Sequence, residues 1–194
     1  IGEEITHATP RTLTEGDAAA NLALLGSRFV VNSSAEFARG IGLKTAPIDD
    51  LLVFNVVLGK TVNDISFNAV SNLGYADGRF GAVVYPGDTL SARSTILGLR
   101  QTSGGDAGVV FVRTLGVNQR DELVISYVRW SVVRKRDAAA PAPEPSVPDL
   151  PEAVGTDSLI VPDELDLAGY DTAAAGGDGA AATPAAAAAA AAAA

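Results

Sequence analysis

The chain has 194 residues, of which 47% are hydrophobic, so it can form one domain of ordinary size with its own core. It has no cysteine and one histidine, which excludes disulfides, thiolate metal sites and multi-histidine sites. All 14 lysines and arginines lie in residues 1–137 beside 14 of the 23 acidic residues, so the net charge of −9 belongs to the tail. A body without net charge excludes nucleic acid as an expected partner, and the acidic tail would be repelled by a membrane surface.

No apolar run outside low-complexity alanine reaches the roughly 18 residues of a transmembrane helix, and no signal peptide is visible at the N-terminus. We therefore expect a soluble, cytoplasmic protein. The chain also contains no methionine and ends in alanines at 185–194. Two interpretations stay open: the composition is natural, or some letters stand for other residues, such as alanine for unidentified residues and asparagine for histidine.

The N-terminal part predicts two short helices. Thr14 and Asp17 have the spacing of a capping box, which favours a helix that ends at Gly26. Ser33 and Ser34 have the side chains that begin a second helix, and the glycines after it would end it.

The longest apolar segment predicts a central helix. Asp49 and Asp50 would lie in its first turn, where carboxylates complement the positive end of the helix dipole. Residues 51–58 are apolar on almost every side, which is typical of a buried helix. Their β-branched members would also permit a strand, but the acidic start and the stop at Gly59-Lys60 favour a helix.

The second half of residues 1–137 has the pattern of β-strands separated by polar turns. A tight turn is expected at Tyr85-Pro86-Gly87-Asp88, because proline presets φ and glycine supplies a positive φ. Helices followed by meandering strands predict an α+β domain with an antiparallel sheet. The expected strands are Ser66–Val84, Thr89–Thr102, Val109–Leu115 and Leu123–Val133.

The composition changes after residue 137, so we expect the domain to occupy residues 1–137. Five prolines between 141 and 151 predict an extended stretch. Segment 138–172 is expected to be an acidic linker, or a strap that packs on a neighbour through the apolar residues around Ile160. Residues 173–194 form a low-complexity, alanine-rich segment, or the unassigned start of a second domain.

Several sequence blocks between residues 10 and 137 resemble, in order, those of MaoC-type hydratases, which are hotdog-fold enzymes acting on acyl-CoA. Within that group the similarity is greatest to the mesaconyl-CoA hydratase family. The resemblance implies a hotdog fold, in which an antiparallel sheet wraps around a long central helix and units pair as a homodimer or a tandem pseudo-dimer. The blocks are TEGD (14–17), GSRF (26–29), EFAR (36–39), APIDDLLVF (46–54), GKTVNDIS (59–66), RFGAVVYPGDTL (79–90), YVRW (127–130) and VRKRD (133–137).

The same resemblance implies an enzyme that reversibly hydrates mesaconyl-CoA (2-methylfumaryl-CoA) to β-methylmalyl-CoA, or acts on a closely related enoyl-CoA. Such a carbon–oxygen lyase takes no cofactor, because CoA is part of the substrate. One alternative is a non-catalytic hotdog half that binds acyl-CoA and supports a catalytic partner. Another is a hotdog acyl-CoA thioesterase, for which Asp49 or Asp50 would have to face the thioester.

The family's catalytic motif pairs an aspartate with a histidine five residues later. The histidine acts as the base, and the aspartate orients the water and returns a proton. These positions fall on Ser27 and Asn32, which cannot titrate near neutral pH. Three interpretations stay open: a second unit carries the pair, Asn32 stands for a histidine, or Ser27 and Asn32 cap the next helix.

Other site residues follow from the resemblance. The backbone N–H groups of Asp50 and Leu51 would polarise the thioester carbonyl from the start of the central helix, although the acids there are equally typical of any helix start. Arg28 and Arg79 are candidates for the substrate carboxylate and Lys60 for a CoA phosphate. Each of these cations has the alternative of a solvated surface charge.

His7 stands near a terminus without a partner of matching type, so we expect a surface histidine. The sequence predicts no metal site, no phosphate-binding loop and no Ser-His-Asp set.

Overall fold

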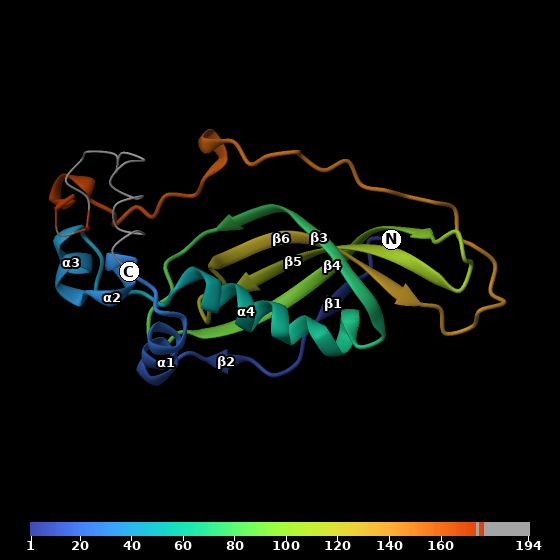
Figure 1. Ribbon diagram of the computed structural model, residues 1–194, viewed down its shortest axis with the longest axis horizontal. Helices are drawn as coiled ribbons and strands as arrows, with labels where there is room; N and C mark the ends of the chain where they lie inside the picture. Colours follow the sequence, from blue (N-terminus) through green and yellow to red (C-terminus); the bar gives the residue numbers. More distant parts are fainter. Residues whose placement is uncertain (174, 177–194) are drawn as a thin grey trace, which may run out of the picture.

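The computed structural model describes residues 1–173, 175 and 176, so the predicted segment 173–194 lies almost wholly outside the described part (Figure 1). Its main feature is an antiparallel sheet in the order β1-β4-β5-β6-β3, with β2 paired to β4. The strands are β1 (Glu4–Thr6), β2 (Arg11–Thr12), β3 (Ala69–Phe80), β4 (Thr89–Gln101), β5 (Ala107–Val117) and β6 (Leu123–Arg134). The helices are α1 (Glu15–Leu25), α2 (Val30–Ser33), α3 (Ala35–Gly40) and α4 (Asp50–Thr61), followed by a π-helical turn η1 (Val62–Ser66) and 3-10 turns η2 (Thr156–Ser158) and η3 (Leu167–Gly169).

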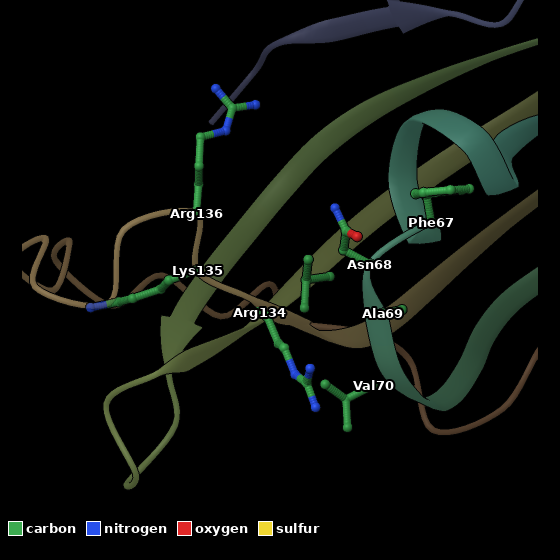
Figure 2. Close-up of a pocket in the computed structure, with 8 residues that line it drawn as sticks. Phe67, Asn68, Ala69, Val70, Arg134, Lys135 and Arg136 are labelled. Carbon is green, nitrogen blue, oxygen red and sulfur yellow. The ribbon is translucent and has the colours of Figure 1, made fainter.

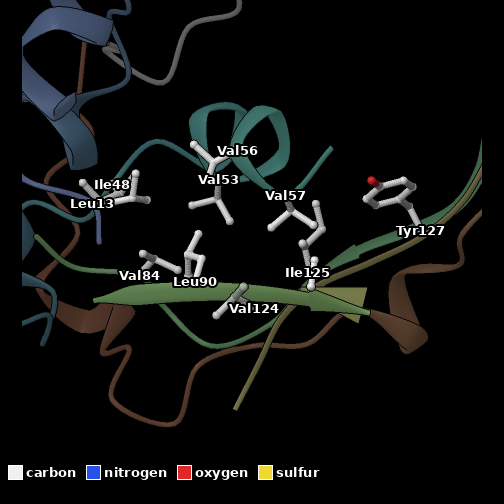
Figure 3. Close-up of a cluster of buried hydrophobic side chains, with 11 residues drawn as sticks. Leu13, Ile48, Val53, Val56, Val57, Val84, Leu90, Val124, Ile125 and Tyr127 are labelled. Atoms are coloured by element: carbon white, nitrogen blue, oxygen red, sulfur yellow. The ribbon is translucent and has the colours of Figure 1, made fainter. Parts of the chain in front are cut away.

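Helix α4 lies across one face of the sheet and forms the main core with it (Figures 1 and 3). Val53 and Val57 of α4 are at most 1% exposed and belong to one apolar cluster with Leu90 of β4 and Val124 of β6. Gly116 of β5 permits close contact, since a Cβ there would lie 2.7 Å from Val57 Cγ2. The predicted antiparallel sheet with a central helix is confirmed.

The predicted helix starts are also confirmed. Asp17 N donates to Thr14 Oγ1 at 3.2 Å and Thr14 N donates to Asp17 Oδ2 at 2.9 Å, which completes the capping box of α1. Gly26 ends that helix in the left-handed conformation, with φ of 59°. Ser34 caps α3 by accepting a hydrogen bond of 3.2 Å from Phe37 N.

The expectation that α4 is buried all round is wrong. An exposed stripe runs along it with the i, i+4 spacing of one helix face, through Leu51, Asn55 and Gly59. Leu51 is 61% exposed, so no described part of this chain covers the stripe. The helix also continues past the predicted stop at Gly59-Lys60, because an internal glycine costs only about 1 kcal/mol and the opposite face is packed on the sheet.

The four predicted strands form, but the first is shorter and pairs differently. Strand β3 covers Ala69–Phe80 and pairs with β6, not with the next strand β4. The turn at Tyr85–Asp88 therefore closes a crossover: Asp88 N donates to Tyr85 O at 3.0 Å, and Gly87 has φ of 99°. The same turn holds Leu13, whose N–H donates to Asp88 O at 2.9 Å. Strands β1 and β2 were not expected, because they are short and gain their hydrogen bonds from distant β4.

The chain after β6 runs back over its own domain (Figure 1). Ser146 N donates to Leu99 O at 2.9 Å, and Asp166 N donates to Ile41 O at 2.8 Å. We call residues 155–172 the strap. No helix within the described residues has the length and hydrophobicity to cross a membrane. The domain boundaries stay predictions.

The close contact at Gly116 generates the first prediction. Gly116→Ala should lower the free energy of unfolding by about 1–3 kcal/mol, because the new methyl group would push against Val57 and Ile125. Gly59→Ala is the matched control: it meets no atom within 4 Å and should stabilise α4 by about 1 kcal/mol. Urea unfolding of both variants measures the difference, and equal effects would contradict the packing argument.

Candidate active site

A pocket of about 350 Å³ lies at the N-terminal end of α4. It is formed by α2, the first turn of α4, the end of β3 and the strap. Most of its wall is apolar, and its polar side chains are Asn32, Asp49 and Asp50. The residues that line it are Phe29, Val31, Asn32, Leu43, Pro47, Asp49, Asp50, Leu51, Phe80, Gly81, Val83, Ile160, Pro162 and Leu165. The structure therefore brings the predicted residues Asn32, Asp50 and Leu51 together.

The first turn of α4 is capped by its own sequence. Asp49 Oδ1 accepts a hydrogen bond of 2.9 Å from Leu51 N, and the Asp49 carbonyl accepts from Leu52 N and Val53 N. The N–H group of Leu51, one of the two predicted oxyanion donors, is thus already engaged. The N–H group of Asp50 has no such partner in the described part of the chain, so it is the donor that a carbonyl oxygen could reach at this helix end.

The pKa of Asp50 departs from its ordinary value. Partial desolvation raises the pKa of its carboxyl, and the neighbouring charge of Asp49 raises it further, although the residue as a whole is exposed to solvent. Asp49 and Asp50 are the titratable residues among those that line the pocket. A carboxyl with a raised pKa in a cleft suits acid–base catalysis. The sequence pattern shows Asp50 only as a helix-start acid, because its pKa depends on walls that come from distant segments.

Asn32 has a positioning contact of its own. Its Nδ2 donates to the Pro47 carbonyl at 3.2 Å, which ties α2 to the segment before α4. Ser27 lies before α2 and does not line the pocket, so the two family positions are not both in it. The interpretation that Ser27 and Asn32 cap the next helix is wrong, because Ser34 caps α3.

The predicted cationic residues lie elsewhere. Arg28 is exposed and does not line the pocket. Arg79 Nη2 lies 2.8 Å from Asp77 Oδ1 without hydrogen-bond alignment, and Asp77 also accepts a hydrogen bond of 2.7 Å from Arg113. Arg113 donates a hydrogen bond to Ser126. The neighbouring Ile125 faces α4, and successive side chains of a strand point to opposite faces of the sheet. Ser126 and this cluster therefore lie on the face away from α4.

Lys60 is ten residues after Asp50, about 15 Å along α4. Its Nζ donates to the Thr9 carbonyl. Burial is the larger cause that lowers the pKa of Lys60, and the nearby charge of Arg11 lowers it further. It lines a separate hollow with Thr9, Pro10 and Arg11. Among the described residues no pocket joins Arg28, Arg79 or Lys60 to Asp50, so their predicted roles stay predictions.

The expectation of a surface histidine is wrong. His7 is 4% exposed; its Nδ1 lies 2.7 Å from Asp64 Oδ2, and its Nε2 lies 2.8 Å from Ser94 Oγ. Ser94 Oγ in turn lies 2.9 Å from Thr114 Oγ1. This Ser-His-Asp chain was not expected either, but Ser94 is 0% exposed, so a substrate cannot reach its hydroxyl. These hydrogen bonds instead connect the end of β1 to the π-helical turn η1 after α4.

A larger hollow of about 750 Å³ lies between the start of β3 and the end of β6 (Figure 2). Its three cations do not converge: Arg134 points toward Val70, whereas Lys135 and Arg136 point in other directions. Lys135 Nζ also donates to the Ala140 carbonyl at 2.6 Å. This hollow is not the best candidate site. Within the described residues no cluster of three or more His, Cys, Asp or Glu side chains could hold a metal ion.

Comparison with known proteins decides the family. The model of the mesaconyl-CoA hydratase family matches residues 1–191. The chain belongs to the mesaconyl-CoA hydratase family. Two curated relatives agree: a β-methylmalyl-CoA dehydratase of Chloroflexus aurantiacus, 60% identical over 89% of this chain and 49% of the relative, and a mesaconyl-CoA hydratase of Cereibacter sphaeroides, 54% identical over 88% of this chain and 50% of the relative.

Solved structures confirm the hotdog fold of this family member. A MaoC domain dehydratase of Chloroflexus aurantiacus superposes with a TM-score of 0.87 at 59% identity, over 92% of this chain and 51% of that one. A Mycobacterium tuberculosis protein described as having a double hotdog fold gives a TM-score of 0.71 at 25% identity, over 89% of this chain and 52% of that one. The chain spans about half the length of the curated relatives it matches.

The buried position of His7 generates the second prediction. His7→Ala should lower the free energy of unfolding by about 1–3 kcal/mol, because it removes the hydrogen bonds that the imidazole makes with Asp64 and with buried Ser94. Glu4→Ala, at an exposed position of strand β1 just before His7, should change the free energy of unfolding by less than about 0.5 kcal/mol. Thermal or urea unfolding compares the two variants. An unchanged free energy of unfolding for His7→Ala would contradict a stabilising role for the buried imidazole.

The raised pKa of Asp50 generates a prediction on pH dependence. Because the folded state raises this pKa above its ordinary value of 3.8, the charged form is disfavoured in the folded state. The stability that the protonated group contributes is present below pH 3.8 and is lost as the pH rises through the raised value. Asp50→Asn should therefore gain stability relative to the wild type as the pH rises from 3.5 to 7. Urea titrations at several pH values test this, and a constant difference would contradict the shift.

Proposed function

We propose that this chain is one hotdog unit of an enzyme that reversibly hydrates mesaconyl-CoA to β-methylmalyl-CoA. The observation that carries the proposal is its 60% identity to a β-methylmalyl-CoA dehydratase within the matched family. The pocket at the start of α4 supports it, because that pocket joins an apolar wall, a helix N-terminus and a carboxyl with a raised pKa. The reaction would take place in the cytoplasm and would need no cofactor beyond the CoA carried by the substrate.

In the proposed reaction, water adds across the carbon–carbon double bond next to the thioester. The hydroxyl group goes to the carbon β to the thioester carbonyl and the proton goes to the α carbon, which carries the methyl group. Negative charge develops on the thioester oxygen, and the Asp50 N–H at the positive end of α4 would donate a hydrogen bond to that oxygen. The Asp50 carboxyl is the proton-transfer group that this half can offer.

A second hotdog unit would complete the assembly, as a tandem domain or a second copy. Strand β3 is an edge strand with exposed apolar side chains, including Leu73 at 48%, Tyr75 at 44% and Phe80 at 37%. An unpaired edge of this kind favours pairing with another strand. Phe80 also lines the pocket, so a partner on this edge would lie beside the site.

A second candidate function is a non-catalytic half that binds acyl-CoA for a catalytic partner. Its support is that Ser27 and Asn32 stand at the family's acid and base positions and cannot exchange protons near neutral pH. In that case the proton-transfer pair belongs to the second unit, and Asp50 has no part in turnover.

Activity of the full-length protein separates these functions. Adding mesaconyl-CoA should remove the enoyl-thioester absorbance without releasing free thiol, whereas thiol release would indicate a thioesterase. Asp50→Asn should lower kcat by about 10²–10⁴-fold, the usual contribution of a general acid or base. Glu36→Gln is the matched control and should leave kcat unchanged, because Glu36 is an exposed acid of α3 that does not line the pocket. An unchanged kcat for Asp50→Asn would assign the chemistry to the other unit.

A further inference from the structure

The strap forms one wall of the candidate pocket. Ile160, Pro162 and Leu165 line the 350 Å³ pocket that also contains Asn32 and Asp50. Ile160 and Pro162 also line a neighbouring hollow of about 750 Å³, whose other side carries Tyr85, Lys44 and Arg120. Both hollows contain Gly81 and Val83 as well. The strap is therefore a partition between two adjoining spaces.

The partition is anchored on one side. Asp166 N donates to Ile41 O at 2.8 Å, and the ring of Tyr170 meets Phe37 edge to face with the centroids 5.3 Å apart. Gly169 packs directly on α3, where a Cβ would collide with the Gly40 carbonyl oxygen. These contacts hold residues 166–170, which follow the wall in the sequence, on helix α3.

The wall has a backbone hydrogen bond of its own, from Leu165 N to the Pro162 carbonyl at 3.1 Å. In the described part of the chain, no N–H group of residues 160–164 donates a hydrogen bond to another backbone carbonyl. Ile160 is 46% exposed and also approaches Gly81, where a Cβ would lie 3.8 Å from Ile160 Cδ1. A change at Ile160 should thus alter the wall while the sheet and α4 stay folded.

We propose that Ile160 and Pro162 of the strap determine substrate size, by separating the pocket at the start of α4 from the neighbouring hollow. This inference rests on the proposed function. At about 350 Å³ the pocket is at the small end of ligand sites, which span about 300–1,000 Å³. A short branched acyl group fits it, and a longer substituent on the double bond meets the strap. Removal of the partition opens the larger hollow to that substituent.

The test compares two substrates with the full-length protein: mesaconyl-CoA and an analogue in which a butyl group replaces its methyl group. Ile160→Ala should raise kcat/KM for the analogue relative to mesaconyl-CoA by about ten-fold or more, the usual effect of a few methylene groups in an apolar pocket. Leu159→Ala is the matched control, because Leu159 is 55% exposed and lines neither hollow. The control should leave the ratio unchanged.

A second pair of variants tests the anchor. Gly169→Ala should release the strap from α3, increase the rate of proteolysis within residues 155–172 and shift the substrate ratio in the same direction as Ile160→Ala. Gly40→Ala lies at the same contact but meets no atom within 4 Å, so it should leave both readouts unchanged.

The outcomes separate this inference from the proposed function. A wild-type protein that turns over neither thioester overturns the hydratase proposal, and the ratio of the two dissociation constants then tests the strap in the same variants. Equal ratios for wild type, Ile160→Ala and Gly169→Ala, by turnover or by binding, overturn the strap inference. A shift equal to that of Leu159→Ala overturns it as well.

Discussion

The close seating of α4 on the sheet is the contact on which the rest of the structure depends. Val57 reaches the sheet over Gly116, where no side chain intervenes. This contact sets the height of the helix above β5 and β6, and with it the position of both helix ends. The N-terminal end then meets α2, the end of β3 and the strap, whose side chains close a pocket around it. An apolar packing constraint thus places the polar end of the helix dipole where a substrate oxygen can approach.

Two neighbouring acids take different tasks at that end. Asp49 is outside the helix and uses its carboxylate to cap it, so its oxygen is committed to Leu51 N. Asp50 is the first helical residue and has no hydrogen bond of this kind among the described residues, while burial raises its pKa. The difference is one of environment and not of residue type. Asp50 is therefore the carboxyl on which the proposed function depends.

The opposite end of α4 has a structural network in place of a site. His7, which follows β1, binds Asp64 and Ser94. Because Ser94 is buried, a substrate cannot reach this hydrogen-bonded network. The side of α4 turned away from the sheet, marked by Leu51, and the apolar residues of edge strand β3 stay exposed. Those two surfaces are consistent with a chain that covers about half the length of its curated relatives, because a hotdog unit in the proposed assembly would have a second unit beside it.

Residue types alone were sufficient to predict the features that arise within a few residues of each other, and to show the family resemblance. The capping box of Thr14 and Asp17, the cap at Ser34 and the turn at Tyr85–Asp88 each close over three residues, so their residue types are sufficient to predict them. The partners of His7, the hydrogen bond between Asn32 and Pro47, and the position of the strap beside the pocket could not be predicted without the folded structure. Those contacts join segments from 15 to more than 100 residues apart, and they depend on how α4 and the sheet are packed.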